Sequence, residues 1–286
     1  MPLQVQSHDG IDLVCDQFGD NAPASVIFAH GGGQTRHAWK KAAESIADKE
    51  ICAVTFDLRG HGDSGWAPEG KYSLEDFGAD LLSIAKVLPK PIHVVGASLG
   101  GMSAMVAAGY LDREAFSSVT LVDVTPTMEI EGILKVVGFM SAHLKDGFGS
   151  IEEAAEVIAE YLPHRPKPKD LRGLSKNLRQ REDGRYRWHW DPDFMSGMWT
   201  AGQARPRDYL KTAVTNIDVP IHLIRGGQSE LVSAAAVKDF LELVPHAAFS
   251  DVAGAGHMVA GDKNDAFVEA VENFIVEVSL RKQNCP

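Results

Sequence analysis

The sequence predicts an α/β fold, with a mostly parallel sheet of eight strands and helices on both faces. Short apolar runs alternate with helical patterns of about 10 to 15 residues, as in consecutive βαβ units. One run, Val26-Ile27-Phe28-Ala29, is continuously apolar, as central strands are when helices cover both faces. The alternation stops from about Thr127 to Val219, which predicts a helical cap inserted after the sixth strand.

The predicted elements follow in order along the chain. Asp9-Gly10 separates two alternating runs between Leu3 and Phe18 and predicts a tight hairpin. Further strands are expected at 26–29, 51–56, 92–95, 119–122, 221–224 and 247–252, and helices at 38–49, 74–88, 99–111, 151–161, 234–243 and 265–280. The predicted division is a core of residues 1–126 and 220–286 and a cap of residues 127–219.

Composition and charge exclude several classes of protein. The 28 Lys and Arg against 39 Asp and Glu give a net charge of −11, which disfavours nucleic acid as the partner. Cys15, Cys52 and Cys285 share no metal-ligand spacing, so neither a disulfide framework nor a zinc site is expected. No basic leader and no run of about 18 apolar residues is visible. We therefore expect a cytoplasmic protein without a membrane span, cofactor or metal.

One segment departs from the acidic average. Residues 161–190 contain nine Lys or Arg and three Asp or Glu, a local charge of +6. A solvated helical face accounts for such a run, and so does a surface that attracts an acidic partner or substrate. Both interpretations stay open at this point.

The segment Gly96-Ala97-Ser98-Leu99-Gly100 follows an apolar strand and opens a small-residue helix. A sharp strand-to-helix turn strains its central residue, and glycines two places away leave room for the neighbouring chain. Ser98 is thereby predicted to be a nucleophile raised above the carboxyl edge of the sheet. The simpler alternative is a glycine-rich turn whose serine caps a helix.

Two glycine-rich loops supply the predicted partners of Ser98. His30-Gly31-Gly32-Gly33 follows the third strand and is expected to form an oxyanion hole from the amides of Gly32 and Leu99. Gly254-Ala255-Gly256-His257 follows the last strand, and His257 is expected to be the general base that a weakly nucleophilic serine requires. A tight loop with no catalytic role is the alternative for the first.

The acid that orients the histidine has two candidates. Gly226-Gly227-Gln228-Ser229 follows the seventh strand with serine where an acid is expected, and Glu230 comes one residue later. Asp123 ends the sixth strand, and a carboxylate at the end of an apolar strand needs a partner. The sequence favours Asp123, with Glu230 as the alternative.

Together these segments and Asp57-Leu58-Arg59-Gly60-His61-Gly62-Asp63-Ser64 resemble the α/β-hydrolase superfamily over nearly the whole chain. Within it the chain is similar to the small, capped, cofactor-free esterases often labelled non-haem haloperoxidases or perhydrolases. Some of these carry an acid after the sixth strand in an Asp-x-x-Pro setting, alongside Gly-Gly-x-Ser after the seventh, and this pairing supports Asp123. The resemblance implies that the Asp57 segment is a structural turn, so neither His61 nor Asp63 is expected to be catalytic.

The predicted function is hydrolysis of a small-molecule carboxylic ester through an acyl-enzyme. Rival functions with the same triad are carbon–carbon bond hydrolysis, acyl transfer or a lyase reaction. A rival of another class is a slow-turnover ligand sensor or partner-binding module. The sequence is also compatible with a homodimer. An apolar acyl group is expected under cap side chains, most of which are expected to be cap core. These side chains are Phe139, Met140, Phe148, Tyr161, Trp188, Trp190, Phe194, Met195, Met198 and Trp199, with His37 and Trp39 from the loop after the oxyanion turn.

Overall fold

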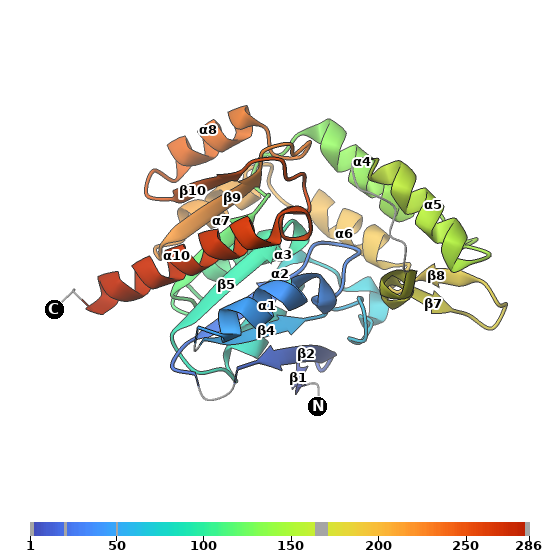
Figure 1. Cartoon of the computed structure of the whole chain (residues 1–286), viewed down its shortest axis with the longest axis horizontal. Helices are drawn as coiled ribbons and strands as arrows, with labels where there is room; N and C mark the ends of the chain where they lie inside the picture. Colours follow the sequence, from blue (N-terminus) through green and yellow to red (C-terminus); the bar gives the residue numbers. More distant parts are fainter. Residues whose placement is uncertain (1–2, 20–21, 50, 164–170, 284–286) are drawn as a thin grey trace.

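The computed structural model describes residues 3–19, 22–49, 51–163 and 171–283. Eight strands form one sheet in the order β1-β2-β4-β3-β5-β6-β9-β10 (Figure 1). The β1–β2 and β2–β4 pairs are antiparallel and the others parallel, so the predicted fold class is confirmed. The strands are β1 Leu3–Gln6, β2 Asp12–Phe18, β3 Ser25–Ala29, β4 Cys52–Phe56, β5 Ile92–Ala97, β6 Ser118–Val122, β9 Ile221–Gly226 and β10 Ala248–Val252.

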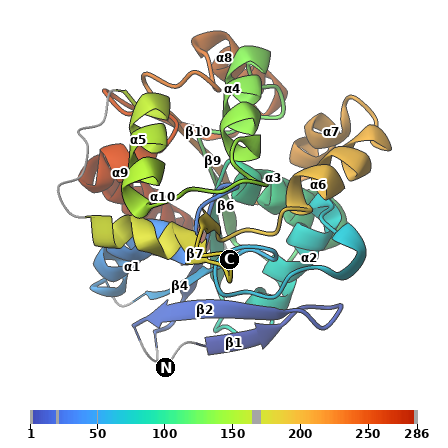
Figure 2. The same cartoon turned by 90° about the vertical axis from the view of Figure 1, so that its right-hand side faces the viewer.

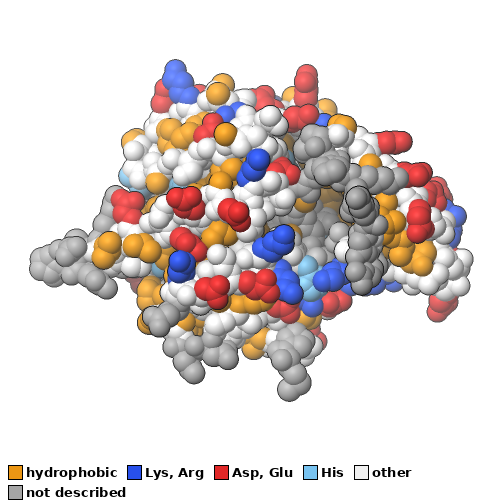
Figure 3. Space-filling model, viewed as in Figure 1, with side chains coloured by type: hydrophobic (Ala, Val, Ile, Leu, Met, Phe, Trp, Pro, Cys, Tyr) orange, Lys and Arg blue, Asp and Glu red, His pale blue; other side chains and the backbone are white. Residues whose placement is uncertain are grey.

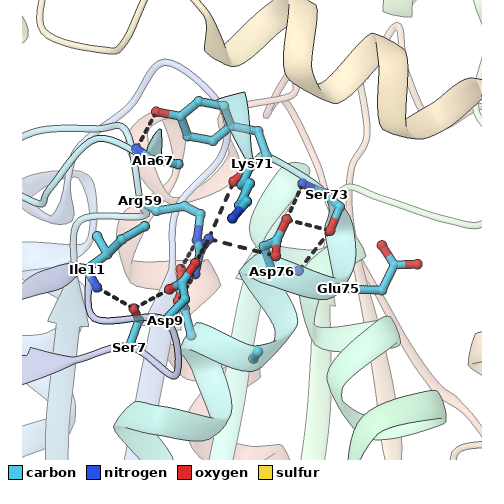
Figure 4. Close-up of polar contacts among 12 residues, drawn as sticks. Ser7, Asp9, Ile11, Arg59, Ala67, Lys71, Ser73, Glu75 and Asp76 are labelled. Carbon is cyan, nitrogen blue, oxygen red and sulfur yellow. Dashed lines mark hydrogen bonds and ion pairs between the residues drawn. The ribbon is translucent and has the colours of Figure 1, made fainter. Parts of the chain in front are cut away.

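The β1–β2 hairpin turns where Asp-Gly predicts it, with Gly10 at φ 86°. Its loop is fixed to the rest of the core by Arg59, whose guanidinium bonds Asp9 at 3.1 Å (Figure 4). The same guanidinium bonds Asp80 at 2.6 Å. Asp80 lies on α2 (Leu74–Ala85), which begins with a capping box between Ser73 and Asp76. The buried Arg59 therefore joins the antiparallel edge of the sheet to its first large helix.

Helices cover the two faces of the sheet (Figure 2). α1 (Lys40–Ala47) and α10 (Asn264–Gln283) share one apolar core with the strands. α2, α3 (Leu99–Val106) and α8 (Ala234–Leu243) belong to the core of the opposite face. Strands β3, β4 and β6 are buried along their whole length, as strands enclosed on both sides must be.

The chain between β6 and β9 is a long excursion from the sheet, and its part from α4 (Ile130–Ser141) to β8 (Tyr186–Trp188) lies at the right of Figure 1. The last element of the excursion, α7, packs against α3 in the helical layer of the core. Since β6 and β9 are hydrogen-bonded neighbours, this long excursion leaves the sheet register continuous. Its elements are α4 Ile130–Ser141, α5 Ile151–Tyr161, a 3₁₀ turn Leu171–Asn177, β7 Leu178–Gln180, β8 Tyr186–Trp188, α6 Phe194–Gln203 and α7 Tyr209–Thr215.

Several basic residues of segment 161–190 are used in local contacts. Arg179 pairs with Asp63 at 2.8 Å, Arg187 pairs with Asp183 at 2.6 Å, and Arg185 bonds backbone carbonyls. Residues 164–170 of this segment lie outside the described residues. On the face seen in Figure 3, basic and acidic side chains are interspersed. Where the segment is described, these contacts favour a solvated face over an open basic surface.

Cys15 and Cys52 are buried, and Cys285 lies outside the described residues. Burial raises the pKa of Cys15 to about 12, which keeps it as the unreactive thiol at neutral pH. In the described part of the chain, no helix combines the length and apolarity needed to cross a membrane.

Candidate active site

Ser98 stands on a strained turn between β5 and α3, with φ 47° and ψ −114°. A side chain at Gly96 would come within 2.5 Å of the Gly100 backbone, and one at Gly100 within 2.3 Å of the Ala29 carbonyl oxygen. Both positions therefore require glycine, for the reason that the spacing predicts. The turn holds Ser98 in a conformation that few non-glycine residues adopt.

Ser98 and His257 line one cavity of about 1410 Å³, together with the predicted oxyanion residues Gly32 and Leu99. Of the ten cap side chains expected over the site, Phe148 is the one that does not line it. The nine that do are Phe139, Met140, Tyr161, Trp188, Trp190, Phe194, Met195, Met198 and Trp199. Between the described Ser98 and His257 side chains there is no hydrogen bond, and such bonds often tighten only in the Michaelis complex.

The acid beside the histidine is Asp123, whose Oδ2 lies 2.7 Å from His257 Nδ1. Asp123 follows β6, is fully buried and has φ 49°. Glu230 is exposed and forms an ion pair with Lys135 at 2.5 Å. Of the two candidates, the structure brings only Asp123 against His257.

Asp123 has two further partners, one at the end of β9 and one in the loop that follows it. Gly226 donates its N–H to Oδ1 at 2.9 Å, and Ser229 donates its hydroxyl to Oδ2 at 2.5 Å. The Ser229 oxygen in turn accepts the N–H groups of Leu231 and Val232 at 3.1 Å. The serine at the expected acid position therefore fixes the carboxylate that approaches from the neighbouring strand.

The predicted oxyanion donors lie on either side of Ser98. Leu99 begins α3, where a backbone N–H has no intrahelical acceptor. The glycine loop lies against the elbow, since a side chain at Gly31 would come within 3.3 Å of Ser98 Cβ. The loop is also bonded to α3, because Gly100 donates its N–H to the His30 carbonyl at 3.2 Å.

Segment 57–64 makes structural contacts, in agreement with the turn that the resemblance implies. Asp57 accepts the N–H groups of Arg36 at 2.7 Å and Asp63 at 2.9 Å, and its own carbonyl accepts the Ser64 hydroxyl at 2.6 Å. A side chain at Gly62 would overlap the Asp57 carboxylate at 2.1 Å. These contacts lie within the turn and its neighbours, and none of residues 57–64 lines the cavity that Ser98 lines.

Trp39 and His37, from the loop after the oxyanion turn, both line the cavity but differ in their other contacts. Trp39 is 3% exposed and packs between Phe28 and Phe267, with ring centroids 5.4 and 5.3 Å away. Most of the Trp39 side chain therefore belongs to the apolar core, although part of it lines the cavity. His37 also lines the cavity and lies 3.6 Å from Asp16.

A possible metal cluster among the described residues is His8, Asp9 and Asp80, which is remote from Ser98 in the fold. Both carboxylates already bond the guanidinium of Arg59. This cation takes the place that a metal would need, so the cluster is better explained as part of the Arg59 network.

Sequence reasoning missed two hydrogen-bonding side chains near the site, Ser229 and His189. Ser229 had a signal, because serine stands in the Gly-Gly-x-x loop where an acid is expected. His189 had none, because it contacts Gly62 across 127 residues of intervening chain. A contact of that separation leaves no local pattern.

Comparison with known proteins identifies the family to which this fold belongs. The model of the alpha/beta hydrolase family matches residues 26–270. Esterase Rv0045c of Mycobacterium tuberculosis is 29% identical over 275 residues, covering 91% of this chain and 85% of that protein. The 2-(acetamidomethylene)succinate hydrolase of Mesorhizobium japonicum is 28% identical, with 87% of each chain covered.

Solved structures give the same result at the level of the fold. The crystal structure of E-2-(acetamidomethylene)succinate hydrolase superposes with a TM-score of 0.81 at 25% identity, covering 96% of this chain and 98% of that one. A structure of the M. tuberculosis esterase has a TM-score of 0.75 at 27% identity, with 96% and 91% covered. The chain belongs to the alpha/beta hydrolase family.

Proposed function

We propose that this hydrolase cleaves carboxylic esters through an acyl-enzyme, with Ser98 as nucleophile, His257 as general base and Asp123 as the orienting acid. The observation that carries the proposal is the 2.7 Å contact of the buried Asp123 with His257, which lines the same cavity as the strained Ser98. A histidine oriented by a buried carboxylate is what a serine hydroxyl needs for activation.

In this mechanism, His257 Nε2 takes the hydroxyl proton while Ser98 Oγ forms a bond to the ester carbonyl carbon. The amides of Gly32 and Leu99 stabilise the oxyanion, which carries its charge only near the transition state. His257 then protonates the leaving alcohol, and the acyl group stays on Ser98. Water, deprotonated by His257, attacks the acyl carbon and releases the acid.

The cavity supports an apolar acyl group. Its wall contains large apolar side chains from α4 and α6 beside a small number of polar ones, which is the usual composition of a small-molecule site. Of its lysines, Lys135 is already paired with Glu230. This lining favours an aliphatic or aromatic acyl group over a dianionic acid such as the succinate derivative in the name of the Mesorhizobium relative.

The test is hydrolysis of p-nitrophenyl esters by the wild-type chain and by Ser98→Ala. We expect turnover of the wild type and a loss of at least about a thousandfold in kcat for the variant. A thermal melt of both proteins provides the control for folding. Ester hydrolysis retained by Ser98→Ala would refute the assignment.

A panel of thioesters and 1,3-diketones separates the ester hydrolase from its rivals. Faster cleavage of a carbon–carbon bond than of any ester would replace the proposed substrate class while keeping the triad. Negligible turnover throughout, with thermal stabilisation by a ligand, would favour the sensor.

A further inference from the structure

His189, which follows β8, reaches from the inserted segment to the glycine loop beside Ser98. Its Nδ1 accepts the N–H of Gly62 at 2.6 Å, and its Nε2 lies 3.3 Å from the carbonyl oxygen of Gly33. Because Nδ1 accepts a hydrogen bond, the ring hydrogen is on Nε2, which donates to Gly33. The side chain is 1% exposed, and burial lowers its pKa to about 2, so the ring keeps this neutral form.

Two other buried histidines hold the neighbouring backbone in the same way. His30 Nδ1 lies 2.8 Å from the carbonyl oxygen of Gly31, and His61 Nε2 accepts the N–H of Gly33 at 3.1 Å. The second nitrogen of each ring bonds a backbone group of residues 58–59, at 3.0 Å in both cases. Each ring is therefore committed to one tautomer by two backbone partners.

The three histidines act on consecutive peptide units of one loop. His30 holds the unit between residues 31 and 32, His61 the unit between 32 and 33, and His189 the unit between 33 and 34. A trans peptide is planar, so its N–H and C=O point in opposite directions. With the Gly31 carbonyl on His30, the N–H of Gly32 is fixed on the opposite side.

We propose that His189 is a positioning residue for the oxyanion hole, through which the inserted segment restrains the glycine loop that carries the Gly32 amide. The inference rests on the proposed function, in which Gly32 is an oxyanion donor. Glycine has wide conformational freedom, and Gly33 already has φ 75°. Without His189, the carbonyl of the peptide unit between residues 33 and 34 loses its hydrogen-bond donor. The loop then gains conformations in which the Gly32 N–H no longer points toward the oxyanion.

The alternative is that His189 only anchors the inserted segment on the core. This chain offers a matched control variant for that alternative, at Tyr72. Tyr72 donates its hydroxyl to Asp191 at 2.5 Å, two residues from His189, and does not line the cavity. Tyr72→Phe removes this buried hydrogen bond between the same two parts of the molecule, together with the bond that the hydroxyl accepts from the N–H of Ala67 at 3.0 Å. Neither bond involves the glycine loop.

The experiment compares His189→Phe, His189→Gln and Tyr72→Phe in the full-length chain. The phenyl ring keeps the shape of the imidazole without hydrogen bonds, whereas the glutamine amide can both accept from Gly62 and donate to Gly33. Steady-state kinetics with a p-nitrophenyl ester gives kcat and KM, and thermal melts give the loss of stability. Amide hydrogen exchange of the peptide spanning residues 30–36 reports the order of the loop without relying on turnover.

We expect His189→Phe to lower kcat about ten- to a hundredfold with little change in KM, because the amide acts in the transition state. Exchange in residues 30–36 should accelerate. His189→Gln should recover most of both losses, and Tyr72→Phe should lower the melting temperature with kcat retained.

Equal losses of kcat in His189→Phe and Tyr72→Phe would overturn the inference, as would unchanged exchange in residues 30–36. These outcomes are distinct from failure of the proposed function, which appears as absence of ester turnover in the wild type or its persistence in Ser98→Ala. The exchange measurement reports whether His189 orders the loop in either case.

Discussion

At the scale of single residues, the choice of acid depends on which carboxylate is buried. Asp123 has no exposed surface and three partners, whereas Glu230 is exposed and bonded to a surface lysine. A buried carboxylate against an imidazole fixes its tautomer and stabilises the imidazolium that forms during catalysis. The exposed ion pair between Glu230 and Lys135 contributes little to fixing the tautomer or to stabilising the imidazolium.

We therefore expect Asp123→Asn to lower kcat by about a thousandfold or more, since asparagine would favour the wrong tautomer of His257. Glu230→Gln should keep kcat within about twofold, because a surface ion pair is worth little. Both variants would be measured on one p-nitrophenyl ester. A larger loss from Glu230→Gln than from Asp123→Asn would reverse the assignment.

Ser229 offers a second test at this scale. Removing its hydroxyl takes one hydrogen bond from the charged Asp123, so we expect Ser229→Ala to lose about 1–2 kcal/mol of stability and about tenfold in kcat. Ser233→Ala is the matched control, since it removes the N-cap of α8 on the same loop at a cost of about 1 kcal/mol. Urea denaturation and kinetics of both variants are needed, and a kcat loss shared by Ser233→Ala would contradict the role of Ser229.

At the scale of elements, the site depends on how closely α3 approaches the sheet. The Gly100 position lies directly against β3, where even one methyl group has no room. In contrast, Gly138 on the exposed side of α4 has no atom near the place of a Cβ. The two glycines thus differ in what an alanine would do, although both lie in helices.

Gly100→Ala should destabilise the fold by about 1–3 kcal/mol and lower kcat, because α3 must shift away from Ala29. Gly138→Ala should stabilise it by about 0.5–1 kcal/mol, since alanine is the better helix former and meets no obstacle. Chemical denaturation would measure both. Equal stability of the two variants would show that the close approach of α3 is not needed.

The sequence predicts most of the sheet and its edge residues because their signals are local. Apolar runs mark the strands, and glycine spacing marks the elbow at Ser98. The β7–β8 hairpin was not predicted, since its three-residue strands are too short to show a period. The sequence allows an argument for Asp123 over Glu230. It does not show the contact of Asp123 with His257, because these residues are 134 positions apart. His189 lacked any local signal for the same reason.

At the scale of the whole molecule, several histidines are buried as neutral rings. Burial is the main cause that lowers the pKa of His30 to about 4, His61 to about 3, His189 to about 2 and His222 to about 4. The unfolded chain takes up these protons below about pH 6.5, whereas the folded chain does not. Their effect on stability therefore vanishes above pH 6.5 and becomes unfavourable as the pH falls toward 4.

We expect the free energy of unfolding to fall between pH 6.5 and 4, by up to about 1.4 kcal/mol per pH unit for each of these histidines. Urea denaturation at pH 7.5 and pH 5 would measure the difference. His222→Gln, which is distant from Ser98, should make this dependence less steep. Stability that is constant over this range would show that the imidazoles are protonated in the folded protein.

The hydrogen bond from His189 to the glycine loop also limits how this chain can be recombined. Since β6 and β9 pair directly, a chimera could replace residues 127–219 with the insertion of another hydrolase and retain the register of its sheet. Such an exchange would remove the donor to Gly33 and the acceptor for Gly62 together. A chimera whose new insertion keeps a histidine at the place of His189 should therefore have a higher kcat than a chimera whose insertion is chosen by overall sequence similarity. This should hold whichever substrate the new insertion admits.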